Sequence, residues 1–194
     1  MCGRYYVDEE TAREIWKIVG KVDEQLKIEG PGRDIHPTEP APVIVGRGEG
    51  LAMAWQRWGY PGFAGSKVVF NARAESVMEK RMFREGIRRH RLVVPGAWFY
   101  EWNRNKEKIT FRREDSPVLF MAGFCSRFED GNRFVILTTQ ANDSMKGTHD
   151  RMPLILEKEQ LEDWVLDEKS VERILAQRPA LLEKRADYEQ QTLF

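Results

Sequence analysis

Cys2 has the most distinctive chemistry in this sequence, which begins Met1-Cys2-Gly3-Arg4-Tyr5. Initiator methionine is normally removed when the next residue is as small as cysteine, and its removal makes Cys2 the N-terminal residue. That residue then carries two nucleophiles, an α-amine that ordinarily titrates near ~8 and a thiol that ordinarily titrates near ~8.5. An amine and a thiol on adjacent carbons can condense with an aldehyde, first as a Schiff base and then as a five-membered thiazolidine ring. The alternative is that Cys2 only follows the initiator and has no chemical role.

Glu101 is a candidate for proton transfer, because it lies between Tyr100 and Trp102 at the end of an apolar strand pattern. Aromatic neighbours exclude water and disfavour the charged form of a carboxylate, and this suits a group that gives and takes protons. The alternative is that strand alternation turns Glu101 toward solvent. The alternation leaves both orientations open, since Glu101 shares a strand face with apolar Phe99.

His149 is the second candidate for acid–base chemistry. It lies beside Asp150 and Arg151 in a polar loop at residues 142–153. A histidine next to an acid and an arginine in such a loop is a candidate general acid or base. A lone loop histidine is more often simply solvated.

Aromatic residues that we expect to be exposed and an arginine cluster are candidates for nucleic-acid contacts. Trp58, Tyr60 and Phe63 lie in or next to a loop rich in glycine and proline, where they either cap a core or stack on bases, at roughly 1–3 kcal/mol per base. A denser than average basic cluster follows at Arg81, Arg84, Arg88, Arg89 and Arg91. Part of this cluster either contacts phosphates or forms a solvated face.

Composition restricts the class of protein. The 194 residues include 31 basic and 31 acidic side chains, so the net charge of zero excludes a globally basic protein that coats DNA. There are two cysteines and no secretory signal, which indicates a reducing compartment without a disulfide framework. Cys125 lies in apolar company and is expected to be buried and structural. No apolar run approaches the ~20 residues of a membrane span, so we expect a cytoplasmic protein without a membrane partner.

The elements that position these residues follow from periodicity. Residues 8–19 predict a helix with Asp8 as N-cap, because apolar residues that include Trp16 recur at helical spacing and would pack on the core. This helix would anchor the strand that holds Cys2.

The proline-rich run at 30–42 is expected to be a turn-rich loop or a linker. Ser76 is expected to cap a helix that runs to about Gly86, and Glu129-Asp130-Gly131 predicts a hairpin turn. Further patterns predict strands at 43–45, 51–58, 92–102, 108–113, 117–124 and 133–141, and helices at about 157–166 and 170–177.

Several short motifs occur in one order along the chain. They are Cys2-Gly3-Arg4-Tyr5, Pro37-Thr38, Trp58-Gly59, Phe70-Asn71-Ala72-Arg73-Ala74-Glu75, Pro95-Gly96, Tyr100-Glu101-Trp102, Leu137-Thr138-Thr139 and His149-Asp150-Arg151-Met152-Pro153. Each motif alone is weak evidence, whereas the ordered set is highly specific. With this set the chain resembles the SRAP family, the SOS-response-associated peptidases.

The resemblance implies an α+β fold in a single domain at residues 2–194, with a mainly antiparallel, barrel-like β core flanked by a few helices. It also implies a sensor of abasic sites in single-stranded DNA, which links Cys2 to the ring-opened sugar through a thiazolidine. The peptidase name then refers to removal of the residues ahead of Cys2. The expected partner is single-stranded DNA with an abasic site, also at junctions of single and double strands. We expect a monomer, associated with the nucleoid after damage, with no cofactor and no metal.

The resemblance also assigns residues to roles. The catalytic residues are Cys2 as nucleophile, Asn71 to orient it, Glu101 to shuttle protons and His149 to favour opening of the sugar ring. The DNA-binding residues are Arg4, Arg73 and Arg151 for phosphates, and Trp58, Trp102 and Pro37 for bases.

Other functions remain open from the residues themselves. Glutamine amidotransferases with an N-terminal nucleophile also begin with Cys-Gly, and they use the α-amine as the base for the thiol. A module that binds single strands without chemistry is a second alternative, in which Cys2 is dispensable. A metal enzyme is disfavoured, because three histidines and two cysteines show no ligand-like spacing.

Overall fold

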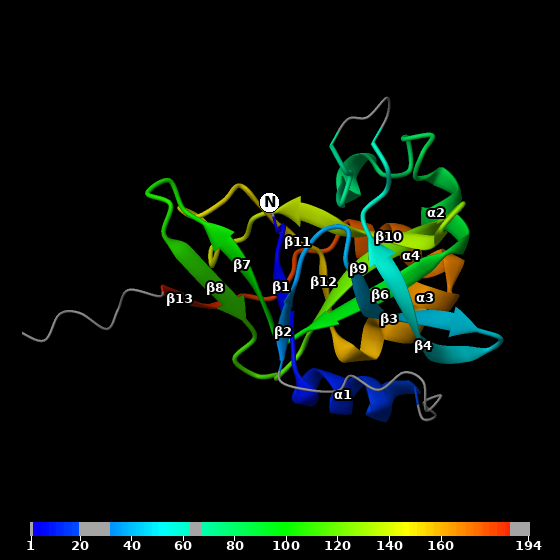
Figure 1. Cartoon of the computed structure of the whole chain (residues 1–194), viewed down its shortest axis with the longest axis horizontal. Helices are drawn as coiled ribbons and strands as arrows, with labels where there is room; N and C mark the ends of the chain where they lie inside the picture. Colours follow the sequence, from blue (N-terminus) through cyan, green and yellow to red (C-terminus); the bar gives the residue numbers. More distant parts are fainter. Residues whose placement is uncertain (1, 20–31, 63–66, 187–194) are drawn as a thin grey trace, which may run out of the picture.

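The computed structural model describes residues 2–19, 32–62 and 67–186, which form two β-sheets with short helices around them (Figure 1). The strands are β1 Tyr5–Val7, β2 Arg33–Ile35, β3 Pro40–Arg47, β4 Gly50–Trp58, β5 Asn71–Arg73, β6 Arg91–Gly96, β7 Trp98–Trp102, β8 Lys108–Arg112, β9 Leu119–Phe128, β10 Gly131–Gln140, β11 Arg151–Pro153, β12 Ile155–Leu156 and β13 Glu183–Ala186. The α-helices are α1 Glu9–Val19, α2 Arg84–Arg89, α3 Leu161–Leu166 and α4 Val171–Leu175. None of the helices in these three ranges is both long and apolar enough to span a membrane.

Five strands of the larger sheet close into a barrel in the order β10-β4-β3-β6-β9, because β9 also pairs with β10. The pairs in this ring are antiparallel except for β4 and β10, which are parallel. Gly131, with a φ of +117°, makes the predicted tight turn between β9 and β10. Closure gives every strand of the ring two partners and removes its exposed edges. The expected α+β fold with a mainly antiparallel, barrel-like core is confirmed.

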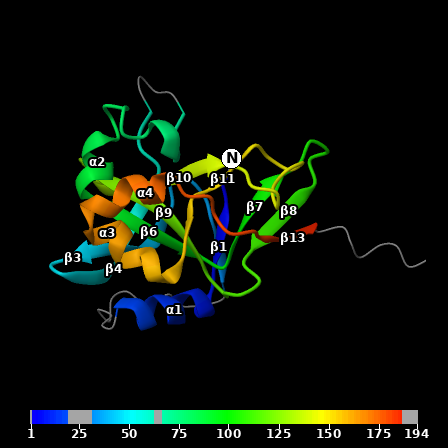
Figure 2. The ribbon, with the colours of Figure 1, turned by 180° about the vertical axis from the view of Figure 1, so that it is seen from behind.

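The second sheet has the order β13-β8-β7-β1-β2 and lies beside the barrel (Figure 2). The two sheets share one apolar cluster, to which Tyr5 and Phe99 contribute from the smaller sheet and Trp58 and Phe134 from the barrel. Strand β1 pairs with both β2 and β7. Cys2 lies three residues before the start of β1 and belongs to the same cluster, so the fold carries it to the place where the two sheets meet.

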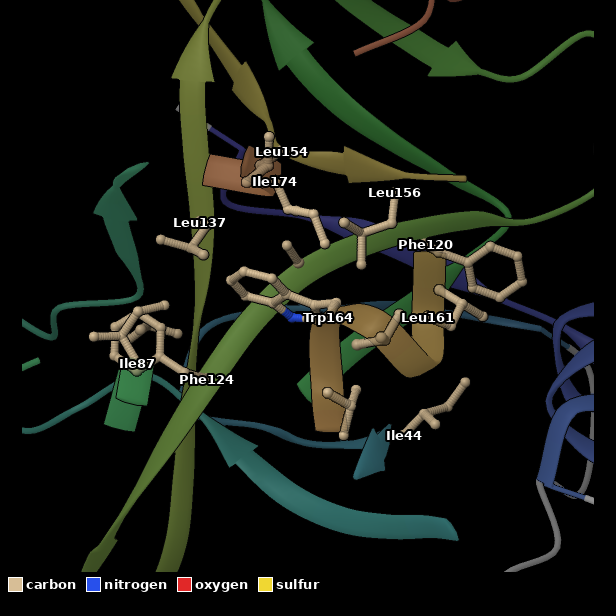
Figure 3. Close-up of a cluster of buried hydrophobic side chains, with 14 of the residues drawn as sticks. Ile44, Ile87, Phe120, Phe124, Leu137, Leu154, Leu156, Leu161, Trp164 and Ile174 are labelled. Carbon is tan, nitrogen blue, oxygen red and sulfur yellow. The ribbon is translucent and has the colours of Figure 1, made fainter. Parts of the chain in front are cut away.

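Helices α3 and α4 cover the outer face of the barrel with a second apolar cluster (Figure 3). Trp164 of α3 lies at the centre of this cluster beside Leu161 and Ile174, and its side chain is fully buried. The buried indole N–H finds a partner, because Trp164 Nε1 donates to the carbonyl oxygen of Leu92 at 2.9 Å. This packing ties the C-terminal helices to β6.

Arg91 differs from the other residues of the predicted basic cluster. Its side chain is buried and donates to the carbonyl oxygens of Trp164 at 2.6 Å and Ile87 at 3.1 Å. Burial lowers the pKa of the Arg91 guanidinium, and the charges of nearby acidic residues oppose that shift. Arg91 is therefore structural, whereas the side chains of Arg81, Arg84, Arg88 and Arg89 are exposed.

The predicted first helix is confirmed to within one residue at its start. Asp8 is the N-cap, because its Oδ1 accepts a hydrogen bond from the backbone N–H of Thr11 at 2.8 Å. The prediction that Trp16 packs on the core is wrong, since its side chain is 42% exposed. The helix instead buries Thr11, Ala12 and Ile15.

Two other local predictions are wrong. The run at 30–42 contains β2 and the start of β3, although residues 30 and 31 lie outside the described part of the chain. Strand β2 forms because it pairs with the distant β1, a contact that local composition does not indicate. The helix expected from Ser76 is replaced by a short 3₁₀ turn at Ala74–Ser76, and α2 begins only at Arg84.

The irregular path between this turn and α2 has a packing reason. This path allows both Val77 and Phe83 to enter the core. In one continuous helix the two residues, which are six positions apart, would point to different faces. Helix α2 then lies very close to β9 at Gly86, where an added Cβ would come within 2.6 Å of Phe124. Glycine at this position permits that contact.

Candidate functional site

Cys2 is buried, with an exposed fraction of 1%, between residues from both sheets. Asn71 of β5 donates a hydrogen bond from its Nδ2 to the carbonyl oxygen of Cys2 at 3.1 Å. On the other side, the backbone N–H of Tyr100 donates to the carbonyl oxygen of Arg4 at 3.0 Å and continues the β1–β7 ladder toward Cys2. The ladder brings Glu101 next to Cys2.

The environment of Cys2 strongly disfavours its thiolate. Burial raises the pKa of the Cys2 thiol far above its ordinary range, and the negative charge of Glu101 raises it further. A hydrogen bond with the backbone of Arg4 opposes the shift only in part. In the chain that begins with Met1, the thiol is therefore protonated at neutral pH.

Glu101 points inward from β7 and is 4% exposed. This orientation decides the question that alternation left open, because Glu101 faces the interior together with Phe99. A buried carboxylate beside a buried thiol is a suitable donor and acceptor for protons on groups bound at Cys2.

Asn71 is held between β10 and the N-terminal residues. Strand β5 pairs in parallel with β10, and Asn71 is opposite Ile136. The Oδ1 atom of Asn71 is buried and has no hydrogen-bond partner among the described residues. A buried acceptor without a partner costs about 1–3 kcal/mol, so this oxygen is ready to accept an N–H from a group that enters the site.

His149 is oriented by the backbone of β11. Its Nδ1 accepts a hydrogen bond from the backbone N–H of Arg151 at 2.9 Å. The neutral ring therefore carries its proton on Nε2, where the ring can donate it. The loop that presents His149 is anchored by Asn142, whose Nδ2 donates to the carbonyl oxygens of Pro179 and Ala180 at 3.0 and 2.9 Å.

The three predicted phosphate-binding arginines differ in how they are held. Arg73 ends β5, is exposed and makes no ion pair with any residue in the described ranges. Arg4 lies 3.6 Å from a carboxylate oxygen of Asp34, and its guanidinium is 5.3 Å from the ring centroid of Trp102. Arg151 forms a two-point ion pair with Glu75.

The predicted base-contacting residues also differ. Trp102 is 40% exposed on the outer face of β7, so a base can reach its ring. Pro37 is half-buried and precedes Thr38, whose φ of +81° marks a tight bend. Both positions are compatible with contact to DNA.

The prediction that Trp58 stacks on bases is wrong. Its side chain is fully buried, its Nε1 donates to the carbonyl oxygen of Phe70 at 2.9 Å, and its ring meets Tyr5 edge to face. Tyr60 is buried as well, and Phe63 lies outside the described residues. Trp58 therefore supports the site from the core, because it packs against Tyr5 of β1, the strand that follows Cys2.

Two acidic residues of the site were not singled out from the sequence. Asp34 and Glu75 each pair with an arginine of the site. Glu75 stands two positions after Arg73 in the motif at 70–75, and that motif was the only available signal. In the described ranges, no three His, Cys, Asp or Glu side chains are grouped so that they could hold a metal ion.

Comparisons with known proteins cover nearly the whole chain. Residues 1–191 match a family model described as SOS response associated peptidase (SRAP). The chain is 33% identical over 183 residues to the abasic site processing protein YoqW of Bacillus subtilis, a match that covers 85% of this chain and 80% of YoqW. Identity to the abasic site processing protein YoaM of the same organism is 32% over 150 residues, which span 70% of this chain and 66% of YoaM.

A distant relative and a solved structure agree with these matches. The abasic site processing protein YedK of Escherichia coli is 26% identical over 181 residues, covering 88% of this chain and 82% of YedK. A crystal structure of a protein from Bacteroides thetaiotaomicron has the same fold, with a TM-score of 0.78 at 21% identity over 95% of this chain and 91% of that chain. Since the family model spans almost every residue, including all those of the site, this chain belongs to the SRAP family.

Proposed function

We propose that this protein processes abasic sites in DNA by linking covalently to them through Cys2. Two observations support the proposal. Two relatives that are 32% and 33% identical to this chain are named abasic site processing proteins. Cys2, the only residue that can present an amine beside a thiol, lies between Asn71 and the buried carboxylate of Glu101. The second observation carries the chemical part of the proposal.

The reaction begins with the α-amine of Cys2, once Met1 has been removed by an initiator peptidase or by the protein itself. The amine attacks C1′ of the ring-opened sugar and forms a carbinolamine. Glu101 accepts the proton that the amine loses and returns it to the hydroxyl group, which leaves as water and gives a Schiff base. The amine acts first because the surroundings of Cys2 disfavour the thiolate.

Ring closure follows on the same carbon. The Cys2 sulfur adds to the carbon of the C=N bond while its proton moves to the nitrogen, so the thiazolidine forms without a further leaving group. The overall change is therefore the loss of one water. His149 donates from Nε2 to the sugar oxygen during ring opening, and Asn71 orients Cys2 through its carbonyl oxygen.

The DNA is held around this centre as a single strand or at the end of a duplex. Arg73, Arg4 and Arg151 contact the phosphates that flank the lesion, since guanidinium groups match phosphate geometry. Trp102 and Pro37 pack against neighbouring bases. Contacts of this kind recognise damage and not sequence, and the protein acts as a monomer.

The direct test is intact mass spectrometry after mixing the protein with a single-stranded oligonucleotide that carries one abasic site. We expect an adduct that survives denaturation, has lost one water, maps to Cys2 and lacks Met1. An undamaged oligonucleotide of the same sequence is the control. If protein that demonstrably starts at Cys2 gives no adduct, the proposal is wrong.

Replacing Trp102 with alanine should weaken binding to undamaged single strands by roughly 5- to 150-fold, since one stacked base contributes about 1–3 kcal/mol. Fluorescence anisotropy with a short labelled oligonucleotide measures the change. Trp55→Ala is the matched control, because Trp55 is 36% exposed and Trp102 is 40% exposed. Equal affinities of the Trp102 variant and the unmodified protein would show that no base stacks there.

A further inference from the structure

We propose that Glu75 is a positioning residue of this site, which holds Arg151 and, through Arg151, the ring of His149. The inference rests on the proposed function for its effect on catalysis. Its geometric part concerns only the protein. Glu75 lies in the 3₁₀ turn Ala74–Ser76 that follows β5, and neither the proposed chemistry nor the proposed DNA contacts use it.

Glu75 and Arg151 form an ion pair with two hydrogen bonds. Arg151 Nη1 donates to Glu75 Oε1 at 2.6 Å, and Arg151 Nη2 donates to Glu75 Oε2 at 2.8 Å. This two-point geometry is the strongest arrangement of an ion pair and fixes the orientation of the guanidinium. The Arg151 side chain is 13% exposed, so loss of the carboxylate would leave a poorly hydrated cation.

Strand β10 takes part in the same contact. Arg151 Nη2 also donates to the carbonyl oxygen of Thr138 at 2.6 Å. Thr138 lies on β10 between β5 and β11, opposite Arg73 on one side and Pro153 on the other. Glu75, Thr138 and Arg151 therefore connect β10 and β11 with the 3₁₀ turn that follows β5, in the region where β10 and β11 approach the start of the chain (Figure 2).

The guanidinium has little capacity left for DNA. Both hydrogens of Nη2 are used by Glu75 and Thr138, and Nε is buried without a hydrogen-bond partner in the described part of the chain. Only one Nη1 hydrogen remains for a phosphate. Arg151 thus differs from the exposed Arg73, and most of its bonding capacity serves to hold the strands.

The same residue determines how His149 is presented. The backbone N–H of Arg151 donates to His149 Nδ1 at 2.9 Å and leaves the proton of the neutral ring on Nε2. The β10–β11 ladder places the backbone of Arg151 opposite Gln140, and the contacts of the Arg151 side chain with Glu75 and Thr138 add a second restraint on this residue. Loss of Glu75 should therefore loosen the orientation of the His149 ring indirectly, through Arg151.

The charge of Glu75 supports this role near neutrality. The hydrogen bond from Arg151 holds the pKa of Glu75 below its ordinary value, and burial, which raises the pKa, opposes this shift only in part. A carboxylate whose pKa is lowered on folding stabilises the protein above its unfolded-state pKa, and that stabilisation is lost only as the pH falls into the acidic range. The pair is thus intact at neutral pH.

The test compares Glu75→Gln with Glu157→Gln. Glu157 also forms a two-contact pair, with Arg113 at 2.8 Å, and the exposed fractions of 45% and 11% match those of 46% and 13% for Glu75 and Arg151. We expect Glu75→Gln to slow adduct formation at saturating DNA about tenfold, less than the ~10²–10⁴-fold that a general acid–base group contributes. Non-covalent affinity should change little when it is measured with a strand that carries a tetrahydrofuran analogue of the abasic site, which has no aldehyde. Glu157→Gln should change neither quantity.

Nitrogen NMR of the His149 ring gives a second result that requires no DNA. The unmodified protein and Glu157→Gln should show a single tautomer with the proton on Nε2, and Glu75→Gln should show a mixture. If Glu75→Gln fails to fold, Arg151→Lys removes the two-point geometry and should give the same mixture.

Each possible result decides between separate claims. An unchanged His149 tautomer together with an unchanged rate would overturn the inference, and a tenfold loss of affinity alone would assign the pair to phosphate binding instead. If the unmodified protein forms no adduct, the proposed function fails, and the NMR comparison still decides the role of Glu75.

Discussion

Cys2→Ser should reduce the denaturation-resistant adduct by more than about 10²-fold, because the nucleophile that closes the ring is lost. The α-amine of the variant remains and should still form a Schiff base with the abasic sugar. That species is reversible, so it should disappear on denaturation and reappear when borohydride reduces it first. Gel electrophoresis of both samples, with and without borohydride, measures the two species.

Cys125→Ser is the matched control for this variant. Cys2 and Cys125 are both buried and both free thiols. Burial raises the pKa of the Cys125 thiol, so it too is protonated at neutral pH. Only position 2 combines the thiol with an N-terminal amine, and Cys125→Ser should therefore keep the full adduct yield.

The outcome for Cys2→Ser also separates the competing functions. A module that binds single strands without chemistry predicts that the variant behaves like the unmodified protein. An amidohydrolase with an N-terminal nucleophile predicts glutaminase activity in the absence of DNA, and loss of that activity in Cys2→Ser. Either of these patterns would contradict the thiazolidine mechanism.

Glu101→Gln should slow adduct formation by about 10²–10⁴-fold, the usual contribution of a general acid–base group. Non-covalent affinity for the abasic strand should stay within about twofold, since Glu101 is buried and is not one of the residues that we propose to contact phosphates. Single-turnover rates at saturating DNA, combined with binding curves for a strand that carries a tetrahydrofuran analogue of the abasic site without an aldehyde, separate the two effects. Equal losses of rate and affinity would indicate that Glu101 is structural.

Glu101→Gln should also lower the pKa of the Cys2 thiol, although it slows the reaction of Cys2 with DNA. The carboxylate of Glu101 raises the pKa of the thiol, so its removal should lower that pKa and increase the thiolate fraction at a given pH. Alkylation of Cys2, followed by mass spectrometry across pH values, should therefore begin at lower pH in Glu101→Gln. An unchanged alkylation profile would mean that Glu101 does not act on Cys2 through its charge.

The sequence alone was enough for the features that depend on neighbouring residues. The start of α1 follows from Asp8 and Thr11, whose hydrogen bond spans three positions. The hairpin at Gly131 follows from a backbone conformation that glycine adopts easily. The order of short motifs also identified the family, since it does not depend on how the chain folds.

Only the tertiary structure decided which side chains face the site. Alternation could not choose the face of Glu101, and its inward orientation follows from the pairing of β7 with β1. Trp58 lies next to a glycine-rich loop and looked exposed, yet the closed barrel and the second sheet bury it completely.

The pairing of Glu75 with Arg151 is the clearest case of this kind. The two residues are 76 positions apart, and they meet because β5 and β11 lie on the two sides of β10. Local sequence determines which conformations a segment prefers, whereas burial and ion pairing depend on contacts between strands that are distant in the chain. For this reason the sequence alone indicated the chemistry of Cys2. Only the fold showed which residues surround Cys2 and which contacts hold those residues in place.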